Sequence, residues 1–285
     1  MDEARPSRTA LRVAMRRAAH QLYDAQPLVF EDPMAVAILG KEYGDEVRRT
    51  PGRNPEAKDR PWSVGLRAFI VARSRYAEEC LARAVADGVR QYVLLGAGLD
   101  TFAHRNPYEG LDVFEVDHPA TQQWKRELLA AGEIAAAGRH HYVAVDFERQ
   151  SLPEELEKTG FNPRMPTFFA WLGVVPYLTL TAFRSTIRFM AGQPEGSGVA
   201  MDYGQPRTAL PFLEQLAHDS LAQRVRQAGE PFQLFFRPSE IAAELARFGR
   251  IEDLGSDEIN ARYFAKRSDR LRLMGTAGRM LSAWV

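Results

Sequence analysis

Two glycines at the end of an apolar run are the first residues whose spacing suggests chemistry. Residues 92–95 are large and apolar, and they lead directly into Gly96 and Gly98. Glycine lets the backbone turn sharply there and lets a ligand approach without a Cβ atom in the way. A second apolar run ends at Asp117, which follows Gly98 by 19 residues. That spacing places a carboxylate at the tip of the neighbouring strand, where it can accept hydrogen bonds from a ribose diol.

Two classes of ligand use such a turn. The dinucleotide fingerprint requires a third glycine, whose place is taken here by Thr101, and Asp100 adds a negative charge that is unfavourable beside a diphosphate. S-adenosyl-L-methionine has no phosphates, so it needs only the first part of the turn, and its sulfonium and amino groups tolerate a carboxylate. The turn, including Ala97, therefore favours S-adenosyl-L-methionine over NAD. A tight β–α turn beside a solvated acid is the alternative without a ligand.

An arginine on an apolar helix face is the second feature. Arg73 lies four residues after Phe69 and four before Ala77, within a stripe of apolar residues. Arg75 lies on the other side of the helix, where Glu79 follows one turn later as a surface partner. A guanidinium group that faces a core is costly unless an anion meets it. The carboxylate of an amino-acid-like ligand would meet this need, and a salt bridge to an acidic core residue is the alternative.

Candidates for catalysis come from aromatic and histidine side chains. Tyr177 and Tyr203 lie at predicted strand ends, and His20 lies on a predicted helix from which it could act as a base. Structural packing is the alternative for each of them. The adjacent His140 and His141 face opposite sides of a strand, and no residues have the spacing of a metal site. The sequence therefore predicts no metal and leaves the catalytic residue open.

The elements that must position these residues alternate helices with short apolar strands. Strands are predicted at 91–95, 111–116, 141–145, 167–172 and 199–203, with helices at 62–88, 119–137, 152–159 and 180–191 between or before them. Helices near 207–227 and 239–248 and a final pair of strands at 251–254 and 262–266 complete the chain. This alternation predicts a mostly parallel sheet with helices on both faces and an antiparallel hairpin at its end.

Residues 1–61 are predicted to form a helical cap or lid, and residues 62–285 the domain that holds the sheet. Ala14, Ala18 and Leu22 repeat at helical spacing, and the Asp32-Pro33 pair opens a short second helix. A loop rich in proline follows at 48–61. Since a sheet of this kind needs no such preface for its own core, we expect it to enclose the ligand and to exclude water. Packing or dimerisation is the alternative.

Composition narrows the class of protein. The 285 residues are 45% hydrophobic and 26% charged, with 37 basic and 37 acidic side chains. This balance gives no electrostatic argument for nucleic acid or an anionic membrane as a partner. No apolar run approaches the roughly 20 residues of a membrane span or follows the basic amino terminus as in a signal peptide. Cys80 is the single cysteine, so no intramolecular disulfide is expected. We expect a cytoplasmic protein that acts on a small molecule. A homo-oligomer is possible, and the sequence leaves the oligomeric state open.

Several strings resemble the leucine carboxyl methyltransferase family. They are ARSRY at 72–76, GVRQYVLLGAGLDT at 88–101, VFEVDHP at 113–119, VDF at 145–147, WLGVVPYLT at 171–179 and NARYF at 260–264. The resemblance extends over nearly the whole chain and is closer to a bacterial branch of S-adenosylmethionine-dependent O-methyltransferases. It implies an α/β, Rossmann-like class I methyltransferase fold, with a seven-stranded, mostly parallel sheet and an N-terminal helical cap.

The resemblance also implies roles for the residues that match the family's motifs. Arg73 would hold the methionine carboxylate of the donor, and Gly96 and Gly98 would pass beneath it. Asp117 would bind the ribose, with Glu115 as an alternative because the two share a strand face.

At the end of the third predicted strand, Asp146 and Phe147 would meet the adenine. One departure concerns the substrate: the leucine-specific enzymes carry a glutamate where this chain has Leu172 followed by Gly173. This difference favours a small molecule over a protein carboxyl terminus. We therefore expect methyl transfer to a small-molecule carboxylate or hydroxyl. A scaffold that keeps the fold without catalysis and a hydride-transferring oxidoreductase are the alternatives.

Overall fold

A single seven-stranded sheet is the framework of the molecule. The computed structural model describes residues 7–49, 61–147, 149–227 and 229–285. The strands are β1 Gln91–Leu95, β2 Asp112–Asp117, β3 Arg139–Ala144, β4 Thr167–Trp171, β5 Gly198–Gly204, β6 Arg250–Leu254 and β7 Gly278–Trp284. They lie in the order β3-β2-β1-β4-β5-β7-β6. The first five pair in parallel, and β7 runs antiparallel between β5 and β6. The mostly parallel seven-stranded sheet expected from the sequence is confirmed.

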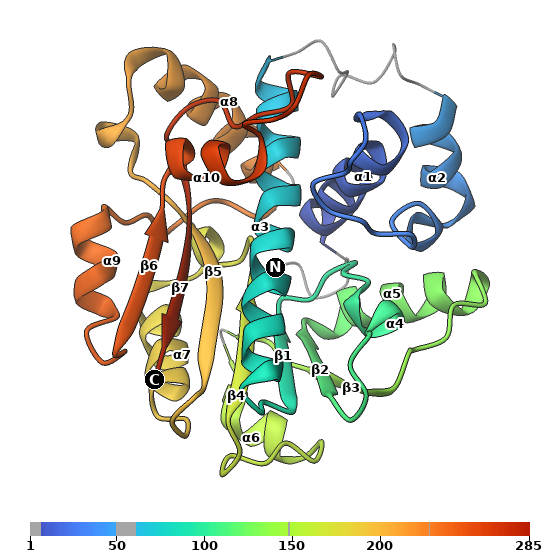
Figure 1. Ribbon diagram of the computed structural model, residues 1–285, viewed down its shortest axis with the longest axis vertical. Helices are drawn as coiled ribbons and strands as arrows, with labels where there is room; N and C mark the ends of the chain where they lie inside the picture. Colours follow the sequence, from blue (N-terminus) through green and yellow to red (C-terminus); the bar gives the residue numbers. More distant parts are fainter. Residues whose placement is uncertain (1–6, 50–60, 148, 228) are drawn as a thin grey trace.

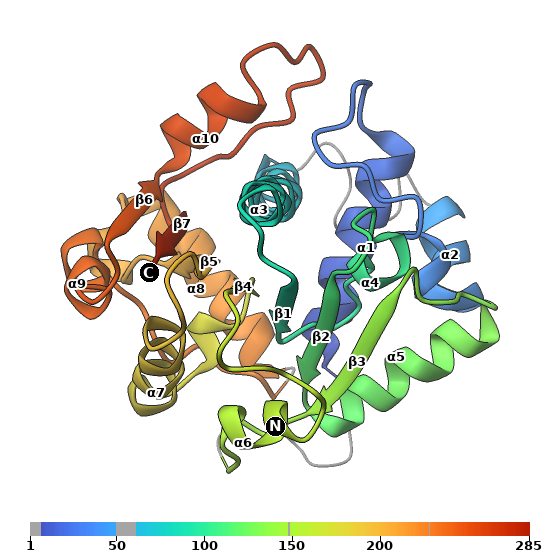
Figure 2. The same ribbon diagram turned by 60° about the horizontal axis from the view of Figure 1, so that its bottom comes forward.

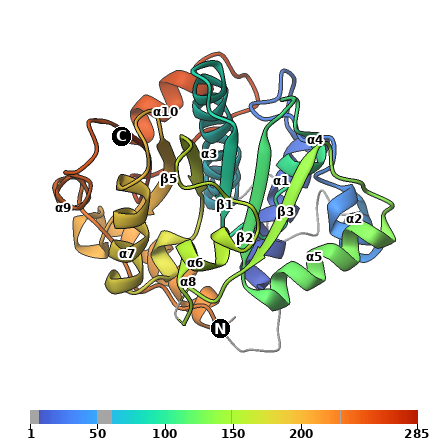
Figure 3. The same cartoon turned by 90° about the horizontal axis from the view of Figure 1, so that it is seen from below.

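Helices cover both faces of this sheet. The longer ones are α1 Arg8–Tyr23, α2 Gly40–Arg49, α3 Pro61–Ala86, α5 Pro119–Ala131, α7 Leu180–Ala191, α8 Phe212–Gln227 and α10 Ser256–Tyr263. The shorter ones are α4 Phe102–Arg105, α6 Leu152–Glu157, α9 Pro238–Glu244 and three 3-10 turns at Ala37–Leu39, Val175–Tyr177 and Arg207–Ala209. Figures 2 and 3 show α3 and α10 on one side of the strands and α6 and α7 on the other. No described helix is both long and apolar enough to cross a membrane.

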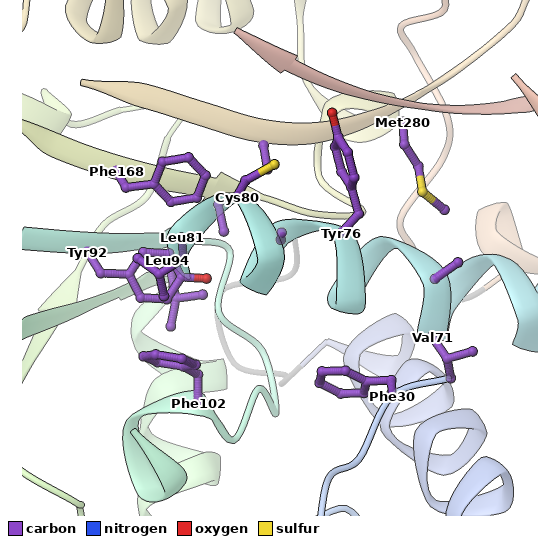
Figure 4. Close-up of a cluster of buried hydrophobic side chains, with 14 of the residues drawn as sticks. Phe30, Val71, Tyr76, Cys80, Leu81, Tyr92, Leu94, Phe102, Phe168 and Met280 are labelled. Atoms are coloured by element: carbon purple, nitrogen blue, oxygen red, sulfur yellow. The ribbon is translucent and has the colours of Figure 1, made fainter. Parts of the chain in front are cut away.

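Alternate residues of the central strands enter two separate apolar layers. In β1, Leu94 belongs to the layer under α3, whereas Val93 and Leu95 belong to the layer under α6, α7 and α9. Both sets are apolar because a central parallel strand is covered on both faces. Figure 4 shows the first layer, where Tyr76 and Cys80 project from α3 toward the strands. Cys80 is thus a small core residue.

The amino-terminal elements form a small core of their own. Figure 1 shows α1 and α2 beside α3 and above α4 and α5 in that view. Their buried apolar residues meet Leu99, from the turn after β1, and Leu129 of α5. The short helix predicted from Asp32-Pro33 is wrong, because turns and the 3-10 helix Ala37–Leu39 precede α2 there. The predicted loop at 48–61 lies largely outside the described residues.

The last predicted strand is also wrong. Residues 262–266 lie at the end of α10 and in the turn after it, and the antiparallel partner of β6 is β7 at Gly278–Trp284. A local cap explains the difference, since the Glu258 carboxylate accepts the Gly255 N–H at 3.0 Å and starts a helix. Ile259 then packs against the α3 layer from this helix. The expected antiparallel addition to the sheet exists, but α10 and a long loop separate its two strands.

Candidate active site

Three cavities lie around the carboxyl ends of the central strands. The β2–β3 cavity, of about 240 Å³, is lined by residues after those two strands. The turn cavity, of about 80 Å³, lies between the glycine turn and α1. The apolar cavity, of about 280 Å³, lies between α3 and α8. Gly173, which follows β4, lines all three, so the cavities meet there. Ligands of open α/β sheets bind at this end of the strands.

The glycine turn is held tightly and leaves no room for side chains. The N–H groups of Gly96 and Ala97 donate to the Val116 carbonyl at 2.8 and 3.0 Å. Gly96 has φ +68°, and a Cβ atom there would lie 2.3 Å from Cγ2 of Val174. Gly98 has φ +51°, and its Cβ would lie 3.1 Å from that of Ala10 in α1. Both the backbone conformation and the close neighbours therefore require glycine.

Asp117 lies beside this turn, as its spacing predicts. Its carboxylate accepts the N–H of Gly98 and, at 2.6 Å, the N–H of His118. Burial raises the pKa of Asp117 to about 6, although these two donors act against the shift. Asp117, Asp146 and Phe147 line the β2–β3 cavity together. The structure thus brings together the residues predicted for ribose and adenine.

Glu115 is directed elsewhere. Its carboxylate lies 2.6 Å from Nζ of Lys125 in α5, and both side chains are about 1% exposed. Burial alone would raise the pKa of Glu115, but the ammonium group of Lys125 holds it below its usual value. None of the three cavities has Glu115 among its described lining residues. We therefore leave Glu115 out of the site, because its charge is already matched by a buried partner.

Arg73 makes the internal salt bridge that the sequence left as an alternative. Its Nη1 donates to Oδ2 of Asp202 in β5 at 3.1 Å, and both residues are buried. The other oxygen of Asp202 accepts the N–H of Gly173 at 2.6 Å. Arg73 nevertheless lines the turn cavity and the apolar cavity, so it faces the place where a ligand would lie. The surface pair of Arg75 with Glu79, at 2.8 Å, is confirmed.

A further arginine links helix α1 to the turn. Arg17 of α1 donates to the carbonyl of Leu99 at 2.8 Å and to the carboxylate of Asp100 at 3.0 Å. Burial would raise the pKa of Asp100, but the guanidinium groups of Arg17 and Arg105 keep it below its usual value. Asp100 and Arg17 both line the turn cavity. The amino-terminal helix is therefore part of the wall around the site.

Of the three catalytic candidates, His20 lines none of the three cavities, Tyr203 lines the apolar cavity, and Tyr177 lies where two cavities meet. It lines both the β2–β3 cavity and the apolar cavity, and burial raises its pKa to about 12. The hydroxyl of Tyr203 donates to Asp253 at 2.7 Å, so it is bound to the far strands of the sheet. His20 lies 2.8 Å from Asp24 through Nδ1, and its Nε2 accepts the N–H of Phe30 at 3.4 Å. With both ring nitrogens engaged inside the cap, His20 is removed as a candidate base.

Several residues of the site were not found from the sequence. Asp202 binds Arg73, and the apolar cavity takes much of its wall from α8 and the segment after it, including His218, Phe232 and Phe235. These residues come from separate segments, so no single motif contains them. One weak signal existed, since His218 and Leu221 are three residues apart on one helix face.

The sequence of this chain matches a known protein family. Residues 10–191 match the family model described as leucine carboxyl methyltransferase. The chain belongs to this family. A relative from Bacillus subtilis, YktD, is 34% identical and matches 97% of each chain. One from Saccharopolyspora erythraea is 32% identical and covers 96% of this chain and 94% of its own. The names of both place them among the S-adenosyl-L-methionine-dependent methyltransferases.

Solved structures share the fold of this family member. A Thermobifida fusca protein named as a methyltransferase superposes with a TM-score of 0.59 at 17% identity, over 99% of this chain and 96% of its own. A DUF574 family protein from Streptomyces avermitilis gives a TM-score of 0.58 at 20% identity, over 94% and 96%. At these identities the likeness concerns the fold, and it agrees with the strand order described above.

Proposed function

We propose that this S-adenosyl-L-methionine-dependent methyltransferase transfers the methyl group to an oxygen atom of a small molecule. The observation that carries the proposal is the meeting of three cavities at Gly173. The donor would occupy the turn and β2–β3 cavities, and the acceptor would occupy the apolar cavity beyond them. Membership of the family supports the donor. Two reactants in adjoining cavities can be held in line for displacement.

The residues present suit the chemical groups of the donor. Arg73 is bound by Asp202 through Nη1, and we assign its remaining donors to the methionine carboxylate. The turn at Gly96 and Gly98 has no Cβ atoms to block close approach. The partly buried carboxylate of Asp117 suits the ribose hydroxyls.

In the β2–β3 cavity, Asp146 and Phe147 suit the amino group and the flat ring of adenine. An acidic oxygen accepts a hydrogen bond from an exocyclic amine, and an aromatic side chain packs on a ring. The two residues follow the third strand, directly beyond Asp117 in the same cavity. A ligand that spans both cavities would thus have a partner for each of its polar ends.

Alignment and exclusion of water are the main contributions that this chain makes to the reaction. The donor brings an activated methyl group on a sulfonium, so no strong acid is needed to release it. The apolar cavity is lined by Leu66, Phe69, Leu221 and Phe232, which keep water from the reacting atoms. Tyr177 lies at the border of the two sites, and with a pKa of about 12 it keeps its proton near neutral pH. We assign it a positioning role.

The shape of the acceptor site supports a small molecule. Gly173 has φ +71°, and a Cβ atom there would lie 2.6 Å from Nη2 of Arg73. A longer side chain, such as the glutamate of the leucine-specific enzymes, has no room next to the Arg73–Asp202 pair. The acceptor site is instead an apolar cavity of about 280 Å³.

Adenosylhomocysteine is expected to raise the melting temperature of the protein. A ligand that binds only the folded state stabilises it by about 2.7 kcal/mol at 100 times its dissociation constant. A thermal melt with S-adenosyl-L-methionine, adenosylhomocysteine and NAD in separate samples measures this. No shift with the first two at millimolar concentration, or an equal shift with NAD, would contradict the proposal. A methyl-labelled donor incubated with a metabolite extract then identifies the acceptor.

Binding of adenosylhomocysteine is expected to strengthen between pH 5 and pH 7. The folded-state pKa of Asp117 is raised to about 6, so the carboxyl group becomes an acceptor of ribose hydrogen bonds only as the pH passes that value. The dissociation constant should rise up to tenfold per unit below about pH 6, which calorimetry can follow. Asp117→Asn should bind more weakly and lose the dependence. A wild-type affinity that stays constant over this range would argue against the ribose role.

We also propose that residues 1–61 form a cap that encloses the reactants. Helix α1 contributes lining residues to all three cavities, among them Thr9, Ala10 and Val13. Since the bound donor would contact this helix, adenosylhomocysteine should slow hydrogen exchange of the α1 amides. Exchange in α7, on the opposite face of the sheet, serves as the internal control. Equal rates in α1 with and without ligand would assign the cap a purely structural role.

A further inference from the structure

His218 is a half-buried residue whose two ring nitrogens are shielded from solvent and lack a hydrogen-bond partner among the described residues. It lies on α8, lines the apolar cavity, and its side chain is 13% exposed. Neither ring nitrogen makes a hydrogen bond to any described residue. Nδ1 has a long ion-pair contact with Oδ1 of Asp219 at 3.8 Å, which is beyond hydrogen-bond distance. The rings of Phe232 and Phe235 pack around it, with centroids at 6.3 and 5.2 Å. An unpaired buried polar group is costly and calls for a ligand.

The two carboxylates and the Tyr203 hydroxyl on this cavity wall already take part in hydrogen bonds. Asp202 is bound by Arg73 and by the N–H of Gly173. Glu214 accepts the N–H of Thr276 at 2.6 Å and its hydroxyl at 3.1 Å. The hydroxyl of Tyr203 is bound to Asp253. The imidazole of His218, which carries one basic nitrogen lone pair when neutral, therefore has no hydrogen-bond partner among the described residues.

Charged groups around the cavity favour an oxygen that becomes negative. The cations that line it are Arg12, Arg16, Arg73 and Arg224, and the acids are Asp202 and Glu214. Next to the imidazole, Asp219 is held at 2.8 Å by Arg207 on the outer side of α8. Tyr177 also faces this cavity and keeps its proton near neutral pH. Positive charges outnumber negative ones on the wall, which stabilises an acceptor that loses its proton.

We propose that His218 binds the hydroxyl group of the acceptor and takes its proton during methyl transfer, so that the acceptor is an apolar phenol or alcohol. The inference rests on the proposed function. A cavity of about 150 Å³ is enough for benzene, so about 280 Å³ accommodates a substituted ring. A carboxylic acid is already ionised and needs no base, whereas a hydroxyl group does.

The proton and the electron pairs balance in this step. The lone pair of a His218 ring nitrogen takes the hydroxyl proton, and an oxygen lone pair forms the new bond to the methyl carbon. The bond between that carbon and sulfur breaks, and its electron pair stays on sulfur. The products are an O-methyl ether, adenosylhomocysteine and a protonated imidazole, which returns its proton to solvent.

Methyl transfer to matched phenols and benzoates tests the assignment. The probes are 4-methylphenol and 4-ethylphenol, with 4-methylbenzoate and 4-ethylbenzoate as their carboxylate counterparts. The wild-type protein should methylate the phenols, with a rate that rises about tenfold per pH unit at low pH and then levels. His218→Gln should lower that rate by at least 100-fold and remove the rise, since a base typically contributes 10² to 10⁴. His218→Phe, which matches the aromatic wall, should behave in the same way.

His141→Gln is the control histidine, because His141 lies on β3, where it pairs with Asp112 outside the three cavities. It should leave the rate and its pH dependence unchanged. An unchanged thermal shift with adenosylhomocysteine shows that each His218 variant folds and binds the donor product. Methylation of the benzoates but not the phenols, turnover of neither class, or equal phenol rates in His218→Gln and wild type would each overturn the inference. If adenosylhomocysteine does not raise the melting temperature of the wild-type protein, the proposed function itself is overturned.

Discussion

Arg73→Ala is expected to lower the affinity for adenosylhomocysteine by at least tenfold, whereas Arg75→Ala should leave it near the wild-type value. The reason is the position of the two side chains, since Arg73 lines the site and Arg75 pairs with Glu79 at the surface. Loss of a charge-assisted hydrogen bond to the methionine carboxylate is worth about 1.5–3 kcal/mol. Titration calorimetry of the two variants and the wild type measures this difference.

Stability must be separated from binding in this experiment. Arg73→Ala leaves the buried carboxylate of Asp202 without its cation, which typically costs about 3–5 kcal/mol. The double variant Arg73→Met with Asp202→Asn removes both charges and keeps the volume, so it should regain much of the unfolding free energy but not the affinity. Equal affinities of Arg73→Ala and Arg75→Ala would contradict the assignment. So would recovery of binding in the double variant.

Gly96→Ala should be the most damaging substitution in the turn. Its φ of +68° costs about 1–2 kcal/mol for a residue with a side chain. The new Cβ atom would also lie 2.3 Å from Val174, and such overpacking adds about 1–3 kcal/mol. We expect the free energy of unfolding in urea to fall by the sum of these terms, and adenosylhomocysteine binding to be lost because Val174 and the turn must move apart.

Gly88→Ala is the matched control for this effect. Gly88 also has a positive φ, +99°, but nothing lies within 4 Å of the position of its Cβ. It should therefore show the conformational cost alone and retain binding. Adding Val174→Ala to Gly96→Ala should recover the packing part of the loss, as a double-mutant cycle would measure. Equal losses from Gly88→Ala and Gly96→Ala would show that the close contact with Val174 has no energetic weight.

The parallel part of the sheet could be predicted because its strands carry their own signal. The central strands β1 and β4 are short apolar runs in which both faces are buried. Strand β7 carries less signal, since residues 278–284 include glycine, arginine and serine and few β-branched residues. Residues 262–266 have aromatic residues that suggest a strand, but the cap at Gly255 makes the preceding segment a helix.

In the site, too, residues that are close in the sequence could be predicted, and contacts between distant residues could not. Gly96 and Asp117 could be found because a turn and a neighbouring strand end are close in both sequence and space. The partner of Arg73 could not be named, because Asp202 is 129 residues away and β5 meets α3 only in the fold. The sequence makes Glu115 a candidate because it shares a strand face with Asp117. The structure pairs it with Lys125 of α5, a contact that the local pattern does not reveal.

The positions of the two binding regions along the chain have a consequence for how this family can diverge. The residues assigned to the donor lie between Arg73 and Phe147, inside the range 10–191 that the family model matches. Much of the acceptor wall, from Asp202 through α8 to Gly278, comes after that range. On the proposed assignment, changes in helix α8, whose lining residues face only the apolar cavity among the three, would alter which compound is accepted without touching the two donor cavities. Exchange of residues 212–227 between relatives is thus a natural route to new selectivity.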